Sequence, residues 1–239
     1  MKKILYSVAL AACCMGTMTS CSDFLDASNK SNVTAKQSFA TKEGLNNLVN
    51  NAYQHLQNVY AAPLFTSCFS AGTDMYADAR NKMNEALNTY ETLTPENTDI
   101  KNLYTYLYSG IRAANSVSYY AQTAQVDEKT KGQLVGEARV LAAYEYYLLV
   151  NNFGGVPIMK DFLTTADTGY PKSSSEDVYA YIISELEDVI SKNVLQASTA
   201  TKGGGRISQE TAKAILAKTY LSAAWDLNKQ DYFSKAAAL

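Results

Sequence analysis

The chain has 239 residues and a formal net charge of −2, and 47% of its residues are hydrophobic while 18% are charged. This composition can form one sizeable core, excludes an intrinsically disordered chain, and argues against a broad nucleic-acid-binding surface. A single histidine, His55, excludes histidine-rich metal sites and most histidine-dependent nucleophiles, and the sequence gives no reason to expect a metal or a cofactor.

The first 20 residues have the pattern of a bacterial lipoprotein signal peptide. Lys2 and Lys3 make the N-terminus positively charged, and no residue from Ile4 to Ser22 is charged. This stretch is interrupted by polar residues and is short for a membrane-spanning helix, which needs about 20 apolar residues. Small residues before Cys21 resemble the site at which cleavage exposes a cysteine for acylation. We therefore expect residues 1–20 to be removed and Cys21 to carry lipid; the alternatives are cleavage before Cys13 and an uncleaved anchor.

Residues 21–33 are polar and show no periodicity, so we interpret them as a tether. The acidic residues directly after Cys21 resemble a signal that sends lipoproteins to the outer leaflet of the outer membrane. With Cys21 acylated, Cys68 would stand alone and no intramolecular disulfide could form. Its neighbours Phe65 and Phe69 favour a small buried residue over a reactive thiol.

The body of the chain begins with helical patterns. Thr34 and Gln37 match a capping box and predict a short turn. From Thr41 to Val59, apolar residues recur at steps of three and four, which predicts an amphipathic helix. The stretch 63–94 breaks this periodicity and is predicted to be an irregular loop insertion.

Two further helices are predicted after this loop. Thr94 followed by Pro95 predicts an N-cap and a first helical position, and the apolar pattern continues to about Ala121. The next helix is predicted over about 130–152, and the glycine pair 154–155 ends it.

The remaining elements follow in order. The stretch 156–162 is predicted to be short and extended. A second capping-box pattern, Ser173 with Glu176, opens another helix, and Ser208 is an N-cap for a helix over 212–225. The last nine residues have the pattern of a helix that has just begun, so we expect the chain to be the N-terminal part of a longer protein.

The four helices after the loop form two similar pairs. The segment that starts at Ile111 matches the one at Leu186, 75 residues later, and the segment at Ala142 matches the one at Leu216, 74 residues later. Small residues stand where helices must approach closely, as in tetratricopeptide-type hairpins. The expected fold is therefore all-α, with stacked tetratricopeptide-like hairpins and one irregular insertion.

Six tyrosines within the predicted helices are expected to pack in the core: Tyr144, Tyr146, Tyr147, Tyr179, Tyr181 and Tyr220. The acidic residues Glu185, Glu187 and Asp188 are expected on a solvated helix face.

Several segments resemble the SusD/RagB family of outer-membrane lipoproteins, in the family's order. The hallmark is residues 136–158, GEARVLAAYEYYLLVNNFGGVPI. The others are 21–26, 104–115, 175–179 and 205–208. The resemblance extends over essentially the whole chain.

The resemblance implies a location and a function. Family members capture nutrients, mainly glycans, for a SusC-like TonB-dependent transporter. It therefore implies a lipid-anchored protein on the exterior of the outer membrane that binds oligosaccharides, is not an enzyme and does not bind nucleic acid. Residues 34–239 would form the N-terminal helical part of a longer SusD-like domain, whose missing C-terminal part contributes to the ligand face. The alternatives are the same fold binding peptides or other nutrients, and a ligand-free interaction scaffold.

Candidate ligand-binding residues are aromatic and polar, because sugars need flat rings against their C–H faces and polar groups for their hydroxyls. The loop 63–94 supplies Asp74, Tyr76, Asp78, Arg80, Asn84 and Tyr90. The resemblance adds Tyr104, which stands where family members commonly carry tryptophan.

Overall fold

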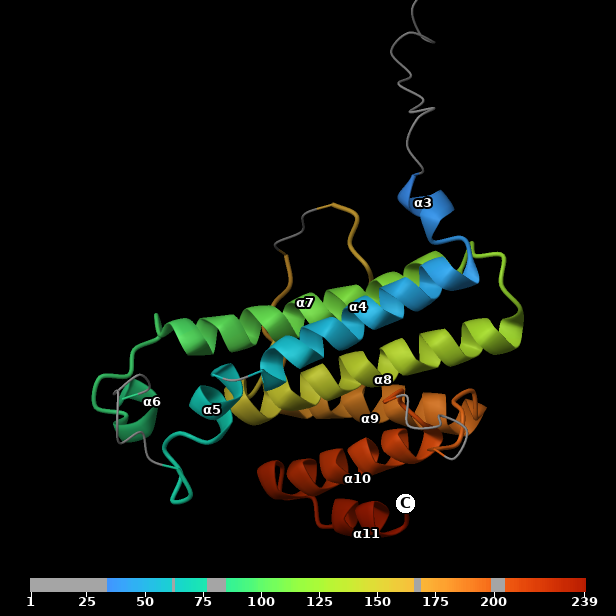
Figure 1. Cartoon of the computed structure of the whole chain (residues 1–239). Helices are drawn as coiled ribbons and strands as arrows, with labels where there is room; N and C mark the ends of the chain where they lie inside the picture. Colours follow the sequence, from blue (N-terminus) through green and yellow to red (C-terminus); the bar gives the residue numbers. More distant parts are fainter. Residues whose placement is uncertain (1–33, 62, 77–84, 166–168, 199–204) are drawn as a thin grey trace, which may run out of the picture. The chain divides into compact units, whose positions relative to one another are not determined.

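The computed structural model describes residues 34–61, 63–76, 85–165, 169–198 and 205–239 (Figure 1). This described part contains nine α-helices and no strand, so the expected all-α class is confirmed. None of these helices is long and apolar enough to cross a membrane. The chain divides into two compact units, residues 1–38 and 39–239.

The described helix of the first unit, α3 (Ala35–Ser38), is a single turn. The Thr34 hydroxyl accepts a hydrogen bond from the Gln37 N–H at 3.3 Å, and the Gln37 side chain accepts one from the Thr34 N–H at 3.0 Å. The predicted capping box is therefore confirmed.

The second unit is a stack of helices. Its elements are α4 (Lys42–Tyr60), α5 (Leu64–Phe69), α6 (Glu85–Thr89), α7 (Thr98–Ala121), α8 (Glu128–Phe153), α9 (Ser175–Lys192), α10 (Gln209–Asp226) and α11 (Asp231–Ala237). From α7 onward each helix packs on the next one with its direction reversed, and α4 packs on both α7 and α8 (Figure 1). The pairs α7 with α8 and α9 with α10 are the two hairpins that the internal repeat predicts.

The five long helices each begin at a side chain that accepts a backbone hydrogen bond. These caps are Thr41, Asn97, Asp127, Ser174 and Ser208. Ser208 matches the predicted N-cap, and α4 begins directly after Thr41, where the predicted helix begins.

Two predicted helix starts were wrong by a few residues. The Thr94 carbonyl accepts the N–H of Asn97 at 3.1 Å, so Pro95 lies in a turn and α7 begins after Asn97. The capping box of α9 pairs Ser174 with Asp177, one residue beyond the predicted pair, because Ser174 has the extended conformation that a cap requires.

The stretch 63–94 is not irregular throughout, as the sequence analysis expected, because α5 and α6 lie within it. These helices have six and five residues, which is too short for a helical period to show in a sequence.

The helical tyrosines pack as expected. Tyr146, Tyr179 and Tyr220 are buried, and Tyr144, Tyr147 and Tyr181 lie half-buried against the core. Within the described part of the chain, the hydroxyls of all but Tyr181 have polar partners; Tyr179, for example, donates to Asp226 at 2.5 Å and so joins α9 to α10. These rings therefore contribute apolar burial and directional contacts together.

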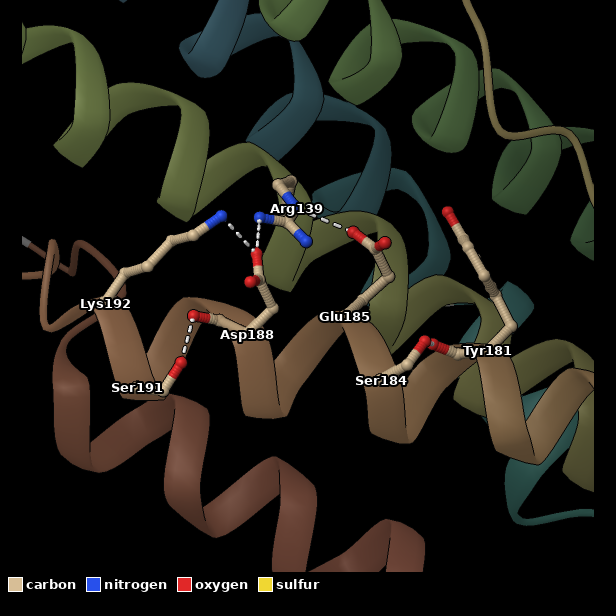
Figure 2. A network of polar contacts seen from close by, with 7 residues as sticks. All are labelled: Arg139, Tyr181, Ser184, Glu185, Asp188, Ser191 and Lys192. Carbon is tan, nitrogen blue, oxygen red and sulfur yellow. Dashed lines mark hydrogen bonds and ion pairs between the residues drawn. The ribbon is translucent and has the colours of Figure 1, made fainter.

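Arg139 on α8 joins that helix to α9 (Figure 2). Its guanidinium lies 2.6 Å from a carboxylate oxygen of Glu185 and 2.6 Å from one of Asp188. Another acid of α9, Glu187, accepts the hydroxyl of a tyrosine on α10 at 2.5 Å. The expected solvated acidic face is confirmed in part, because Glu187 is exposed whereas Glu185 and Asp188 are half-buried beside Arg139. The sequence of α9 alone does not reveal the donors that the neighbouring helices supply.

Glu137 is a fully buried carboxylate on α8 with several partners. Nε of Arg206 lies 2.7 Å from it, the Tyr53 hydroxyl donates to it at 3.0 Å, and Nε2 of Gln133 donates at 3.1 Å. The Tyr53 oxygen in turn accepts the N–H of Ile207 at 2.8 Å. The helices α4 and α8 and the segment before α10 thus meet at one satisfied charge.

Glu145 is a second fully buried carboxyl on α8, and its two oxygens have no hydrogen-bond partner in the described part of the chain. It packs against Gly110 of α7, where an added Cβ would stand 1.7 Å from Oε1. Burial raises the pKa of Glu145 well above its usual value of 4.5, which favours the neutral acid.

Removing the Arg206 cation from its pair with the buried Glu137 should strongly destabilise the fold. Arg206→Met leaves Glu137 buried without its charge partner, and we expect the free energy of unfolding in urea to fall by about 3–5 kcal/mol. The matched control is Lys229→Met, which breaks the exposed pair with Glu176 and should change the free energy of unfolding far less. Equal losses in the two variants would contradict the assignment.

The buried acid predicts a pH dependence of stability. The unfolded chain releases the Glu145 proton near pH 4.5, whereas the folded chain retains it to higher pH. The stability from the neutral acid is thus complete below the unfolded pKa and is lost as pH rises through the folded pKa. Relative to Glu145→Gln, the wild-type chain should lose unfolding free energy in urea titrations as the pH rises above 4.5, until the pH has passed the raised folded-state pKa. Parallel profiles would show that the carboxyl does not titrate this way.

Candidate functional site

One face of α7 carries a row of aromatic and polar side chains. Tyr104, Tyr108, Arg112 and Asn115 follow one another at steps of four and three, which places them on the same side of a helix. The Tyr104 and Tyr108 ring centroids are 4.8 Å apart, and the Tyr104 ring meets Phe153 edge-on at 5.2 Å. The rings are therefore held by packing before any ligand arrives.

The segment that follows α8 lies along this face and is fixed by three side chains. The Tyr108 hydroxyl donates to the Pro157 carbonyl at 2.7 Å, and Nδ2 of Asn115 donates to the Met159 carbonyl at 2.9 Å. The Met159 N–H donates to the Tyr146 hydroxyl at 2.7 Å. The segment predicted to be short and extended is not helical and forms no strand, and these helix side chains satisfy its backbone groups.

Two hollows lie between this segment and α7. The larger has a volume of about 510 Å³ and a mostly apolar lining. Tyr104, Tyr108 and Arg112 line it on the helix side, and Pro157, Met159 and Tyr170 line it on the other. The smaller, of about 280 Å³, is lined by Arg112, Asn115 and Asp161 among others.

The larger hollow combines the groups that saccharide binding requires. Its tyrosine rings offer flat apolar faces, and the hydroxyls of Thr105 and Ser109 can pair with sugar hydroxyls. Burial raises the pKa of Tyr108 well above its ordinary value, so its hydroxyl stays protonated and keeps its bond to Pro157. The arrangement is suited to binding.

The side chains with nucleophilic or metal-binding chemistry lie elsewhere. The Cys68 thiol donates to the Asp99 carbonyl at 3.7 Å, and burial raises its pKa to about 11, so it is a packing residue. His55 is half-buried, and burial lowers its pKa. Among the residues that the structure describes, no three His, Cys, Asp or Glu side chains stand close enough together to hold a metal ion.

Of the predicted ligand residues, Tyr104 lines the larger hollow. Asp74, Tyr76 and Tyr90 lie around α5 and α6, and they are not among the residues that line either hollow. Tyr90 has a positive φ of 63°, and its hydroxyl lies where a Cβ on Gly72 would be only 2.1 Å away. Asp78, Arg80, Asn84 and Cys21 lie outside the described residues. The ligand roles of these residues stay predictions.

Three lining residues, Tyr108, Arg112 and Tyr170, were not predicted from the sequence as ligand residues. The first two lie one and two turns after Tyr104, so helical spacing alone could have found them. Tyr170 comes from a segment without periodicity, and the sequence contains no signal that places it opposite α7.

A comparison with protein families identifies the chain. The family model described as "Starch-binding associating with outer membrane" matches residues 23–221, which is most of the sequence. The chain belongs to this SusD-like family. The resemblance found in the sequence is thus confirmed, and the family's description names binding and no catalytic activity, in agreement with the expectation of a non-enzymatic protein.

Similar curated proteins carry the same family name. A SusD-like protein from Bacteroides ovatus is 29% identical over 134 residues, which are 54% of this chain and 24% of the relative. SusD-like protein P38 from Formosa agariphila is 27% identical over 190 residues, which are 77% of this chain and 36% of the relative. The match therefore spans about a quarter to a third of these relatives' length.

Solved structures share the fold. Surface glycan-binding protein A from Bacteroides uniformis has a TM-score of 0.68 and 26% identity, over 81% of this chain and 44% of that one. A SusD homologue from Bacteroides thetaiotaomicron has a TM-score of 0.71 and 21% identity, over 88% of this chain and 42% of that one. A laminarin-binding SusD-like protein has a TM-score of 0.66 and 22% identity, over 79% and 41%.

Proposed function

We propose that this protein is an outer-membrane lipoprotein that faces the cell exterior, binds oligosaccharides and delivers them to a SusC-like TonB-dependent transporter. The observation that carries the proposal is the tyrosine-lined hollow of about 510 Å³ between α7 and the segment after α8. The family's description, which names starch binding and the outer membrane, supports the same function.

The hollow is suited to ring-shaped ligands because tyrosine rings line it, and its walls are formed in advance. Tyr104 is braced by Phe153, and Tyr108 holds the opposite wall through its hydroxyl. Binding to such a site orders few side chains, so more of the contact energy is available as affinity. The names of two structural neighbours, a surface glycan-binding protein and a laminarin-binding protein, record saccharide binding by those proteins.

The anchor and the domain boundaries are part of the proposal. Residues 1–20 would be the signal peptide, residues 21–33 the tether, and residues 34–239 the N-terminal part of the SusD-like domain. Acylation of Cys21 would hold the protein at the membrane, and more than one acyl chain is needed for stable attachment. The stacked hairpins would then present a rigid surface to the transporter.

The ring of Tyr104 should be needed for saccharide binding. Tyr104→Ala removes one flat face from the larger hollow, and we expect the affinity for laminarin or malto-oligosaccharides in calorimetry to fall about tenfold. The control is Tyr106→Ala, because Tyr106 is an exposed tyrosine on the same helix that lines neither hollow.

The two tyrosine variants also separate the alternative functions. Equal affinity in both would remove the hollow from the binding site. Binding to a pool of peptides and to no saccharide would favour the alternative nutrient class. Capture of a large membrane partner, with no ligand of either kind, would favour an interaction scaffold.

The proposed anchor predicts a change in location. Cys21→Ala should leave the chain without acyl groups and move it from the membrane fraction to the soluble fraction after cell lysis. Cys13→Ala is the matched control and should leave the protein in the membrane fraction. Labelling of the Cys21→Ala chain by a fatty-acid probe would refute the assignment.

A further inference from the structure

Arg112 is a cation without a partner in the described part of the chain. The other two described arginines are both neutralised, Arg139 by two acids of α9 and Arg206 by Glu137. Arg112 forms no ion pair and no hydrogen bond there, and it is exposed. Its guanidinium lies 5.5 Å from the centroid of the Phe162 ring, a contact that orients the group without neutralising it.

The positive charge of Arg112 lies in the lining of the candidate site. Arg112 lines both hollows, and among the residues that the structure describes it is the only charged one in the lining of the larger hollow. Asp161 lines the smaller hollow and is not among the residues that line the larger. Among the described residues, the lining of the larger hollow therefore carries a positive charge and no negative one, which attracts an anion.

An arginine beside tyrosine rings favours one kind of saccharide. Its planar fork of N–H donors matches a carboxylate or a sulfate with two parallel hydrogen bonds, and such charge-assisted bonds are about twice as strong as neutral ones. A neutral sugar would leave this charge without a counter-charge. Stacking on Tyr104 and Tyr170 would bring an acidic substituent within reach of the guanidinium.

We propose that the larger hollow binds acidic saccharides, with a uronate carboxylate or a sulfate ester paired to Arg112. This inference rests on the proposed saccharide-binding function and names the ligand class for the same site.

Calorimetry on the 239-residue chain tests the inference with three probes: oligogalacturonate, sulfated carrageenan oligosaccharides, and neutral laminarin. At least one acidic probe should bind more tightly than laminarin, and its affinity should fall as salt is added. Arg112→Gln should weaken that probe about tenfold and leave laminarin within about twofold. The two acidic probes distinguish a carboxylate ligand from a sulfate ligand.

Two further variants test whether the loss of affinity depends on the position of the Arg112 charge and on the shape of its guanidinium. Lys160→Gln removes the same charge from the neighbouring segment outside the larger hollow, so it should leave the affinity for the acidic probe within about twofold. Arg112→Lys retains the charge and loses the fork, so an intermediate affinity is expected. Because Arg112 is exposed and unpaired, its variants should melt at the wild-type temperature, which separates loss of binding from loss of folding.

Each remaining outcome has a distinct meaning. If Arg112→Gln weakens laminarin and the acidic probes equally, or if only laminarin binds, the acidic-ligand inference is overturned while the proposed function stands. If the wild-type chain binds malto-oligosaccharides and none of the three probes, only this inference is overturned. If it binds neither the three probes nor malto-oligosaccharides, the proposed function fails and this inference fails with it.

Discussion

The buried charge of Glu137 is the contact on which the helical stack depends. Apolar burial holds helices together without choosing their register, because it has no direction. A buried carboxylate without partners costs several kcal/mol, so arrangements that separate Glu137 from Arg206 or Tyr53 are disfavoured. We infer that this pairing fixes α4 against α8. The helix that packs on both of them, α7, is then fixed as well, and α7 carries the candidate site.

Contacts on both sides of α7 shape the candidate site. On the inner side, Gly110 lets α8 approach so closely that the carboxyl of Glu145 fills the space of a missing Cβ. On the outer side, Tyr108 has two roles, because its ring lines the larger hollow while its hydroxyl holds the wall at Pro157. Asn115 holds the same wall two residues further along the segment, at the carbonyl of Met159. The larger hollow is therefore formed by packing within the protein and needs no ligand to form, as a preorganised binding site requires.

Much of this fold could be predicted from sequence, because periodicity and end signals are local properties. The helix after Thr41 and the end of α8 at Gly154 were predicted correctly for that reason. Contacts between helices were not predictable in the same way. Arg139 meets acids 46 and 49 residues away, and no local pattern in α9 shows that a cation stands opposite. The hollow was found only in part, since Tyr104 was identified by resemblance while Tyr170 faces it through tertiary structure alone.

A crystal structure of the chain with an oligosaccharide that it binds in calorimetry would test the account most directly. The account predicts a sugar ring against Tyr104 and Tyr170, between α7 and the segment after α8, with the helix positions unchanged. A saccharide held instead by Asp74 and Tyr90 in the stretch 63–94, with the larger hollow empty, would contradict it.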